Sequence, residues 1–348
     1  MHRRTKLFIR CAACFVFIGI VAAGVLVWVG STHPISQGVQ KISVDTDPST
    51  KEWRDRIKAV GATAAYQEFL AAYAMETPTE QHPRAHVFGR ALYQTVGLDG
   101  VTVCDQHFNF GCFHEFLGLA IQERGLGIVP TLNEDCITKL KDNAPGCQHG
   151  LGHGIISYVG YDDKDLIKAL EVCDKLRGQP PVGGCLGGEF MEYNLQTMLG
   201  DEAHIRPLHG DPYYPCDTLA EQFQDACYYE QPQWWLMLSW GDRGDQQKRG
   251  ELFRRVGQWC AEAPRASLQR HCYLGIGNNA PPVVDWNEGK MVRECERMPT
   301  LDAEIDCRAA AAGAFFSKST SQEAPWGTCN GLSAADYDRC VLIAQSPR

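Results

Sequence analysis

The chain has 348 residues, of which 44% are hydrophobic and 22% charged, a balance typical of folded proteins rather than disordered ones. Its formal net charge at pH 7 is −9, and four of its 33 basic residues lie in residues 1–10. The rest of the chain therefore carries 29 basic against 42 acidic residues, a net charge of −13. This acidic balance argues against a polyanionic partner, and we expect no binding to nucleic acid.

The first predicted element is a membrane-spanning helix. Residues 11–30 form an uncharged apolar run of 20 residues, which is long enough to cross a bilayer. The basic tail, residues 1–10, precedes this run, so the positive-inside rule places the N-terminus in the cytoplasm. A cleaved signal peptide is the alternative, but the run is long for one and no small-residue cleavage site follows it. We expect a single-pass protein of the cell membrane, with most of the chain periplasmic or extracellular.

The next segments predict a tether and an opening pair of helices. Residues 31–50 are polar, contain two prolines and show no hydrophobic period, so we expect a flexible tether. Residues 51–75 and 82–97 have the apolar spacing of helices, with Pro83 in the first turn of the second. Runs of alternating β-branched residues are missing, so the extracytoplasmic domain, residues 51–348, is predicted to be all-α.

Fourteen cysteines follow the anchor and form seven consecutive pairs. Within a pair the cysteines are 8, 11 or 12 positions apart, and the pairs recur every 32 to 44 residues. This period is typical of a two-helix repeat. Zinc-finger spacing is absent after the anchor, and the expected compartment is oxidising, so the pairs predict local disulfides. The predicted bridges are Cys104–Cys112, Cys136–Cys147, Cys173–Cys185, Cys216–Cys227, Cys260–Cys272, Cys295–Cys307 and Cys329–Cys340.

The residues around each cysteine pair indicate a helical hairpin. The first cysteine lies in or ends an amphipathic stretch, and the second begins a stretch rich in apolar and small residues, such as CQHGLGHGIISYV. We therefore expect an outer helix, a turn and an inner helix, with the disulfide across the turn. Such a bridge stabilises a hairpin by about 3 kcal/mol in the chain-entropy account. The small residues allow close helix approach, and the array can form an open α-solenoid or a closed α/α toroid.

In this architecture the chain resembles the Sel1-like cysteine-rich repeat proteins, in which disulfides link helical hairpins. The resemblance covers the repeat pattern alone, because the usual cysteine spacing in those proteins is shorter than the 11 to 12 positions that predominate here. The openings CQHG and CLGG are locally similar to the inner-helix starts of lanthionine-cyclase-like toroids, whose zinc-binding cysteine arrangement is not matched. These resemblances imply a helical repeat fold and assign no activity.

Histidines gather at the starts of three predicted helices. His82 and His86 are four residues apart, as are His149 and His153. Histidines four apart on a helix point to one face and can bind one metal ion. His114 and His149 each follow the second cysteine of their pair by two residues, so they occupy equivalent positions in neighbouring repeats. This pattern predicts a histidine-rich site on adjacent inner helices.

Carboxylates and an arginine accompany these histidines. Glu189 and Glu192 are three apart in the next repeat, Glu115 follows His114 directly, and Arg90 can orient a carboxylate or bind an anionic ligand. Histidine and carboxylate sets suit zinc, iron or manganese, and we expect zinc or iron. The candidate metal ligands are His86, His114, His149, His153 and Glu189. The candidate catalytic carboxylates are Glu192 and Glu115, and the candidate ligand-binding residues are Arg90 and His82.

Several functions stay open at this point. A metal-dependent enzyme would use a bound ion to activate water or dioxygen, with a glutamate handling protons. A binding scaffold would instead present a concave face to a peptide, glycan or protein partner. Metal storage or sensing at the cell surface would need the ion without turnover. A purely structural role is the remaining interpretation, since histidines and glutamates at helix starts can cap helices and interact with their dipoles.

Overall fold

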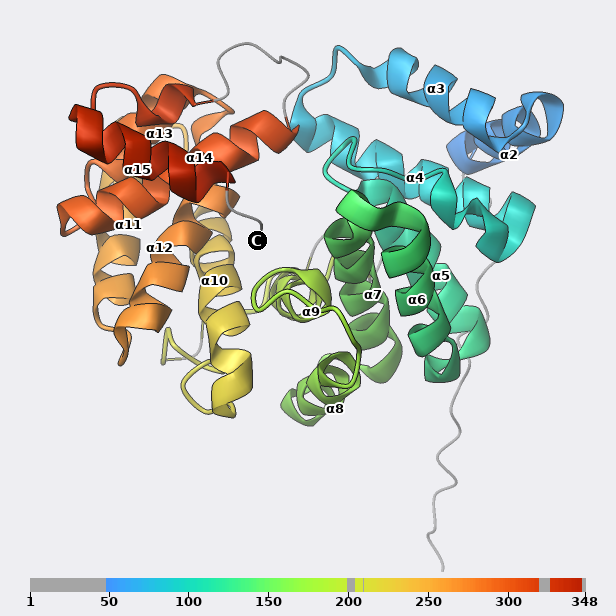
Figure 1. Cartoon of the computed structure of the whole chain (residues 1–348), viewed down its shortest axis with the longest axis horizontal. Coiled ribbons are helices and arrows are strands. Elements are labelled where there is room, and N and C mark those ends of the chain that lie inside the picture. Colours follow the sequence, from blue (N-terminus) through green and yellow to red (C-terminus); the bar gives the residue numbers. More distant parts are fainter. Residues whose placement is uncertain (1–47, 199–203, 209, 319–325, 346–348) are drawn as a thin grey trace, which may run out of the picture. The chain divides into compact units, whose positions relative to one another are not determined.

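The computed structural model describes residues 48–198, 204–208, 210–318 and 326–345. These residues lie in one compact unit and form α-helices, short 3-10 helices and turns, with no strand among them, which confirms the all-α prediction for this part of the chain (Figure 1). The predicted cytoplasmic tail and membrane anchor, residues 1–30, lie outside the described residues. Within the described ranges, no helix combines the length and the hydropathy needed to span a membrane.

The α-helices of the described residues alternate with shorter 3-10 segments. In chain order they are α2 (Pro48–Val60), α3 (Ala62–Tyr73), α4 (Pro78–Val96), α5 (Gly111–Arg124), α6 (Val129–Leu140), α7 (Ala144–Val159), α8 (Asp163–Asp174), α9 (Gly184–Leu195), α10 (Glu221–Met237), α11 (Gln246–Ala261), α12 (Ala266–Asn279), α13 (Glu288–Cys295), α14 (Leu301–Lys318) and α15 (Ala334–Gln345). The 3-10 segments are η1 (Gly97–Thr102), η2 (Leu126–Ile128), η3 (Lys141–Asn143), η4 (Trp240–Asp242), η5 (Pro281–Val284) and η6 (Gly327–Cys329).

The opening helices differ in their bounds from the predicted ones. Helix α2 begins at Pro48, inside the segment expected to be tether, and Gly61 separates it from α3. Gly61 has a φ of 86°, a left-handed conformation that glycine adopts without steric cost, so the predicted single helix is divided here. Helix α4 begins at Pro78 because Thr77 and Glu80 form a capping box. Pro83 consequently lies inside the helix rather than in its first turn.

All seven predicted disulfides are present, with Cα atoms 5.4 to 5.9 Å apart. Four of them join an outer α-helix to an inner one: α6 to α7, α8 to α9, α11 to α12 and α13 to α14. The expectation of an outer α-helix in every repeat is wrong at Cys104, which lies in irregular chain, at Cys216, which lies in a turn, and at Cys329, which lies in a 3-10 segment. Nearby prolines such as Pro212 and Pro215 disfavour a helix before Cys216.

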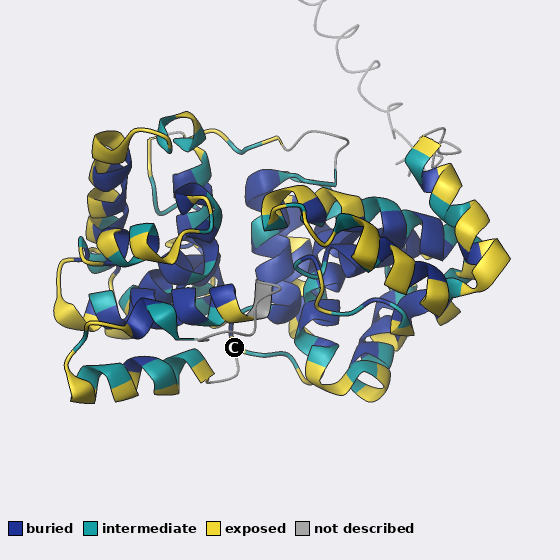
Figure 2. Cartoon of the chain, turned by 90° about the horizontal axis from the view of Figure 1, so that it is seen from above, coloured by how far each residue is buried: buried dark blue, intermediate teal, exposed yellow. Residues whose placement is uncertain are grey.

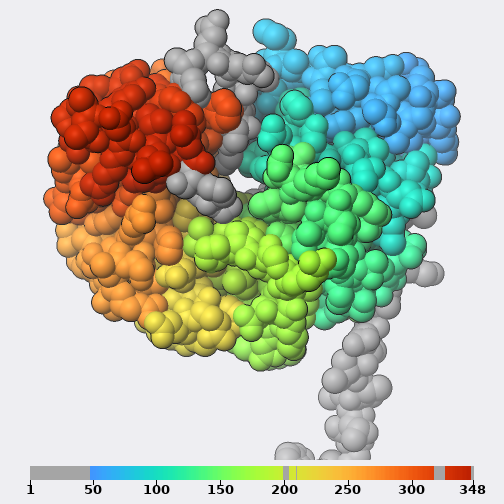
Figure 3. All heavy atoms as spheres, viewed as in Figure 1, coloured from blue at the N-terminus to red at the C-terminus, as the bar shows by residue number. Residues whose placement is uncertain are grey.

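The inner helices pack on one another in chain order. Helix α4 contacts α5, and the succession continues through α7, α9, α10, α12 and α14. Helix α9 buries 11 of its 12 residues, whereas its outer partner α8 buries 5 of 12. Figure 2 shows the same contrast, with buried residues where helices face one another and exposed residues along outer faces. In the space-filling view, segments that follow one another in the chain also adjoin on the surface (Figure 3).

Glycines bring neighbouring inner helices into backbone contact. A Cβ atom at Gly152 of α7 would lie 2.0 Å from the carbonyl oxygen of Cys185 in α9. A Cβ atom at Gly277 of α12 would lie 2.1 Å from the carbonyl oxygen of Cys307 in α14. No side chain fits at either position without a backbone shift, which confirms that small residues permit the close approach expected of the inner stretches.

Candidate metal centre

The inner helices line a common cavity of about 300 Å³. Counted from the second cysteine of each pair, the second and sixth residues of the inner helices repeatedly face it. The residues at these positions that line the cavity are His114, His149, Met191, Tyr229, Asn278 and Gly313. A cavity of this size matches the lower range of small-molecule sites. The alignment of repeats on their second cysteines therefore identifies which residues can meet in space.

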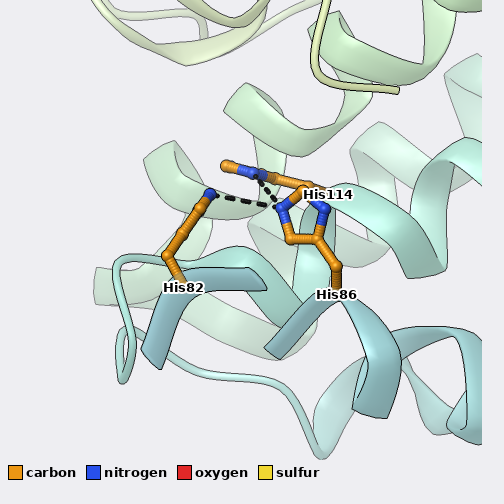
Figure 4. Close-up of side chains that lie close together, drawn as sticks. All are labelled: His82, His86 and His114. Atoms are coloured by element: carbon orange, nitrogen blue, oxygen red, sulfur yellow. Dashed lines mark hydrogen bonds between the residues drawn. The ribbon is translucent and has the colours of Figure 1, made fainter. Parts of the chain in front are cut away.

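Three imidazoles converge beside this cavity, and we call His82, His86 and His114 the first triad (Figure 4). The Nε2 atoms of His82 and His86 are 3.2 Å apart, and His86 Nε2 is 3.3 Å from His114 Nδ1. The ring centroids are 4.8 to 5.3 Å apart, and the ring planes are inclined by 67° to 79°. Two imidazoles on one tetrahedral zinc ion, bound at about 2.0–2.1 Å, have nitrogens about 3.3 Å apart. The first triad therefore has the spacing of a shared metal ion.

The fold positions each ring of the first triad. His82 and His86 lie one turn apart on α4, and His114 lies in the first turn of α5. The Nδ1 atom of His82 is 3.0 Å from the carbonyl oxygen of Phe108. Because a carbonyl oxygen only accepts hydrogen bonds, this contact requires a proton on Nδ1, and a neutral ring then has its lone pair on Nε2, toward His86. Orientation of a ligand histidine by a backbone carbonyl is common at metal sites.

The turn before α5 is strained and was not recognised from the sequence. Phe108, Asn109 and Phe110 have φ values of 52°, 57° and 61°, which non-glycine residues rarely adopt. Residues held in this region cost of order 1–3 kcal/mol each and cluster at functional sites. Here the turn directs the Phe108 carbonyl to His82, and Asn109 and Phe110 line the cavity. This strained turn therefore lies at the site.

Burial sets the protonation of two rings of the first triad, His86 and His114. It lowers the pKa of both His86 and His114 well below the usual histidine value, and the neighbouring imidazoles lower them further. Both rings are therefore neutral near pH 7, the form that binds a cation. His114 is 2% exposed, and its Nε2 atom is buried without a hydrogen-bond partner among the described residues. A buried, unpaired ring nitrogen is costly unless a ligand satisfies it.

A second group, which we call the second triad, consists of His114, His149 and His153. The Nε2 atoms of His149 and His153 are 3.1 Å apart. His153 Nδ1 lies 3.0 Å from Glu192, a carboxylate that also accepts a hydrogen bond of 2.7 Å from the Tyr161 hydroxyl. The rings of His114 and His153 are stacked, with centroids 4.2 Å apart and planes inclined by 18°. The rings of the second triad therefore leave less room for an ion between them than those of the first.

The two carboxylates of α9 occupy different environments. Burial raises the pKa of Glu192, but the hydrogen bond from His153 and further donors outweigh it and hold that pKa below the usual value. Glu189 is fully buried, neither oxygen has a hydrogen-bond partner among the described residues, and burial raises its pKa well above the usual value. Its carboxylate lies with the sulfurs of Cys173 and Cys185, which are bound to each other. The structure therefore groups Glu192, and not Glu189, with the imidazoles.

The other two predicted residues form an ion pair beside the first triad. Arg90 Nε donates to Glu115 Oε1 at 2.8 Å, between α4 and α5. Glu115 is 7% exposed, so the pair is shielded on the carboxylate side. Arg90 thus orients the Glu115 carboxylate, which directly follows His114 in the chain.

Sequence reasoning missed Glu230 of α10. Its side chain is 2% exposed and lines the cavity. A Cβ atom at Gly187 would lie 3.0 Å from Glu230 Oε1 and 3.5 Å from His149 Nδ1, so both groups border the space that this glycine leaves. An alignment of the repeats on their second cysteines could have identified Glu230. In that alignment Tyr229 is equivalent to His149, and Glu230 follows Tyr229 directly.

No known protein family, curated protein or solved structure matches the chain. The likeness to cysteine-rich helical repeat proteins therefore extends to the described helices and the seven disulfides alone.

Proposed function

We propose that the chain is a membrane-anchored, extracytoplasmic protein whose first triad binds a divalent transition metal, zinc or iron. The observation that carries this proposal is the convergence of three imidazoles at nitrogen distances of 3.2 and 3.3 Å, with steeply inclined rings. Three histidine ligands leave a fourth position of a tetrahedral ion for water or substrate, as in catalytic rather than structural zinc sites. The ion would activate water or dioxygen at the cavity, and the candidates for proton transfer are Glu230, which lines the cavity, and Glu115, which follows His114 directly.

The proposed location rests on two features of the chain. Seven disulfides form and persist in oxidising compartments, which favours a periplasmic or extracellular position for the helical unit. The apolar run at residues 11–30, with basic residues before it, supports a single-pass anchor whose N-terminus is cytoplasmic.

For the repeat array we favour a closed α/α ring over an open solenoid. Trp286 Nε1 donates to Thr79 Oγ1 at 3.4 Å across 207 residues of chain, between the turn that follows η5 and α4. Residues from Asn109 to Ala344 line the same cavity, which an extended array would not bring together. The small volume of the cavity also supports a small-molecule substrate over the alternative of a scaffold for peptides, glycans or protein partners.

Elemental analysis tests this function directly. We expect the full-length chain, purified in detergent without a histidine tag and with its disulfides intact, to contain zinc or iron. His86→Ala should remove the ion from the first triad, because two imidazoles alone bind far more weakly than three. His204→Ala is the matched control, since His204 is exposed and outside both triads.

A metal-free protein would contradict the proposed function. Wild-type protein that is correctly folded and remains metal-free after incubation with excess zinc and iron would contradict the proposal and favour the scaffold. Circular dichroism and the count of free thiols would show that His86→Ala retains the helical fold and its disulfides.

A further inference from the structure

We propose that the second triad holds a second metal ion, joined to the first through the ring of His114. This inference rests on the proposed function of the first triad and adds to it a paired metal centre. His114 is the residue that the two triads share. The ligand class is a pair of first-row divalent ions that accept imidazole nitrogen, such as zinc or copper.

The two nitrogens of His114 have different surroundings. Nδ1 lies 3.3 Å from His86 Nε2 and so belongs to the first triad. Nε2 is buried and has no hydrogen-bond partner in the described ranges, although the ring stands within reach of His149 and His153. An imidazole that loses its remaining proton can bind one cation at each nitrogen. The unpaired Nε2 atom is thus the natural ligand for a second ion.

The other two ligands of the second triad lie close together, and a carboxylate holds one of them. His149 Nε2 and His153 Nε2 are 3.1 Å apart, close to the nitrogen spacing of the first triad. Glu192 holds His153 at Nδ1 with a contact of 3.0 Å, which leaves the Nε2 lone pair for a cation. A carboxylate behind a ligand histidine is a common feature of metal sites, where it fixes the ring and raises its basicity.

The two triads are not equally ready to bind an ion. Centroids in the second triad are 5.4 Å apart for His114 and His149, and 4.9 Å for His149 and His153, as in the first triad. The third pair, His114 and His153, is stacked at 4.2 Å, so one of these rings must turn before both can bind one ion. We therefore expect the first triad to fill first and the second ion to bind more weakly.

Copper loading of the full-length protein tests this arrangement. Cu²⁺ titration with elemental analysis should reach two ions per chain, in two resolved steps. Two Cu²⁺ ions joined by an imidazolate couple magnetically, so the electron paramagnetic resonance signal should rise with the first ion and fall with the second. Glu192→Gln should weaken the second step by about 10- to 100-fold and leave the first unchanged. His204→Ala should bind and couple like the wild type.

Other results of the titration would contradict one or both of the two metal-site proposals. Saturation at one ion per chain, or two ions whose signals add without coupling, would overturn the shared centre while leaving the first-triad proposal intact. Wild-type protein that binds no metal would overturn both. Because the main measurement uses the wild-type protein, the proposal stays testable even if a variant fails to fold.

Discussion

The first half of the helical unit, which carries the two triads, and the second half pack their inner helices in the same way. They differ in the side chains that they present to the cavity. Gly152 in the first half and Gly277 in the second make the same backbone contact with the next inner helix. Toward the cavity, however, α5 and α7 present His114 and His149, whereas α12 and α14 present Asn278 and Gly313. The repeat therefore needs its glycines and disulfides but not its histidines. This difference argues that the imidazoles serve a ligand rather than the architecture.

The largest effect that tests the shared plan is loss of a disulfide. Replacing both cysteines of Cys173–Cys185, or both of Cys260–Cys272, should lower the free energy of unfolding by about 3 kcal/mol, because each bridge closes a loop of similar length. Both pairs have a sequence separation of 12. Urea denaturation followed by circular dichroism measures the loss. A large loss of stability from one replacement and none from the other would show that the two halves are not stabilised in the same way.

A smaller effect should follow from filling the helix contacts. Gly152→Ala and Gly277→Ala should each lower the free energy of unfolding by about 2 kcal/mol, because the added Cβ meets a carbonyl oxygen of the next helix. Gly127→Ala is the control, since nothing lies within 4 Å of a Cβ atom there. The control should stay within about 0.5 kcal/mol of wild type. Equal stability for all three variants would show that the glycines are not required for packing.

The smallest effect concerns a repeat position that holds a buried apolar residue in α7 and α12 but a glutamate in α9. The fourth residue after the second cysteine is Leu151 in α7 and Ile276 in α12, both buried, but Glu189 in α9. Glu189→Gln should raise the free energy of unfolding at pH 7 by about 1 kcal/mol, because an amide never ionises, whereas the Glu189 carboxyl must take up a proton or bury a charge when the chain folds. Glu192→Gln is the matched comparison and should lower it, since the Glu192 carboxylate accepts several hydrogen bonds.

The advantage of Glu189→Gln should depend on pH. The pKa of Glu189 is raised in the folded protein, so the contribution of this carboxyl to stability is greatest at pH values below its unfolded-state pKa, where it is protonated in both states. That contribution then falls as the pH rises above the unfolded-state value, about 4.3, toward the folded pKa. Denaturation at pH 4, 5.5 and 7 should show a growing gap between variant and wild type. A gap that shrinks with rising pH would contradict the assigned environment.

The sequence by itself determined the features that depend on short separations along the chain. Each disulfide joins cysteines at most 12 positions apart, so their spacing was enough to pair them. The helical class followed from apolar periodicity, and the equivalence of His114 and His149 followed from counting within repeats. Local chain geometry limits the outcome in each case, and little is left for packing to change.

Only the tertiary structure decided which side chains meet. Residues three apart on a helix differ in direction by about 60°, so Glu192 reaches His153 while Glu189 turns to a disulfide, although both were predicted to share one face. His82, predicted as a ligand-binding residue, joins the imidazoles through the carbonyl of a strained turn, and Glu230 arrives from a later repeat. Helix rotation and the approach of distant repeats set these contacts, and neither is encoded in local spacing.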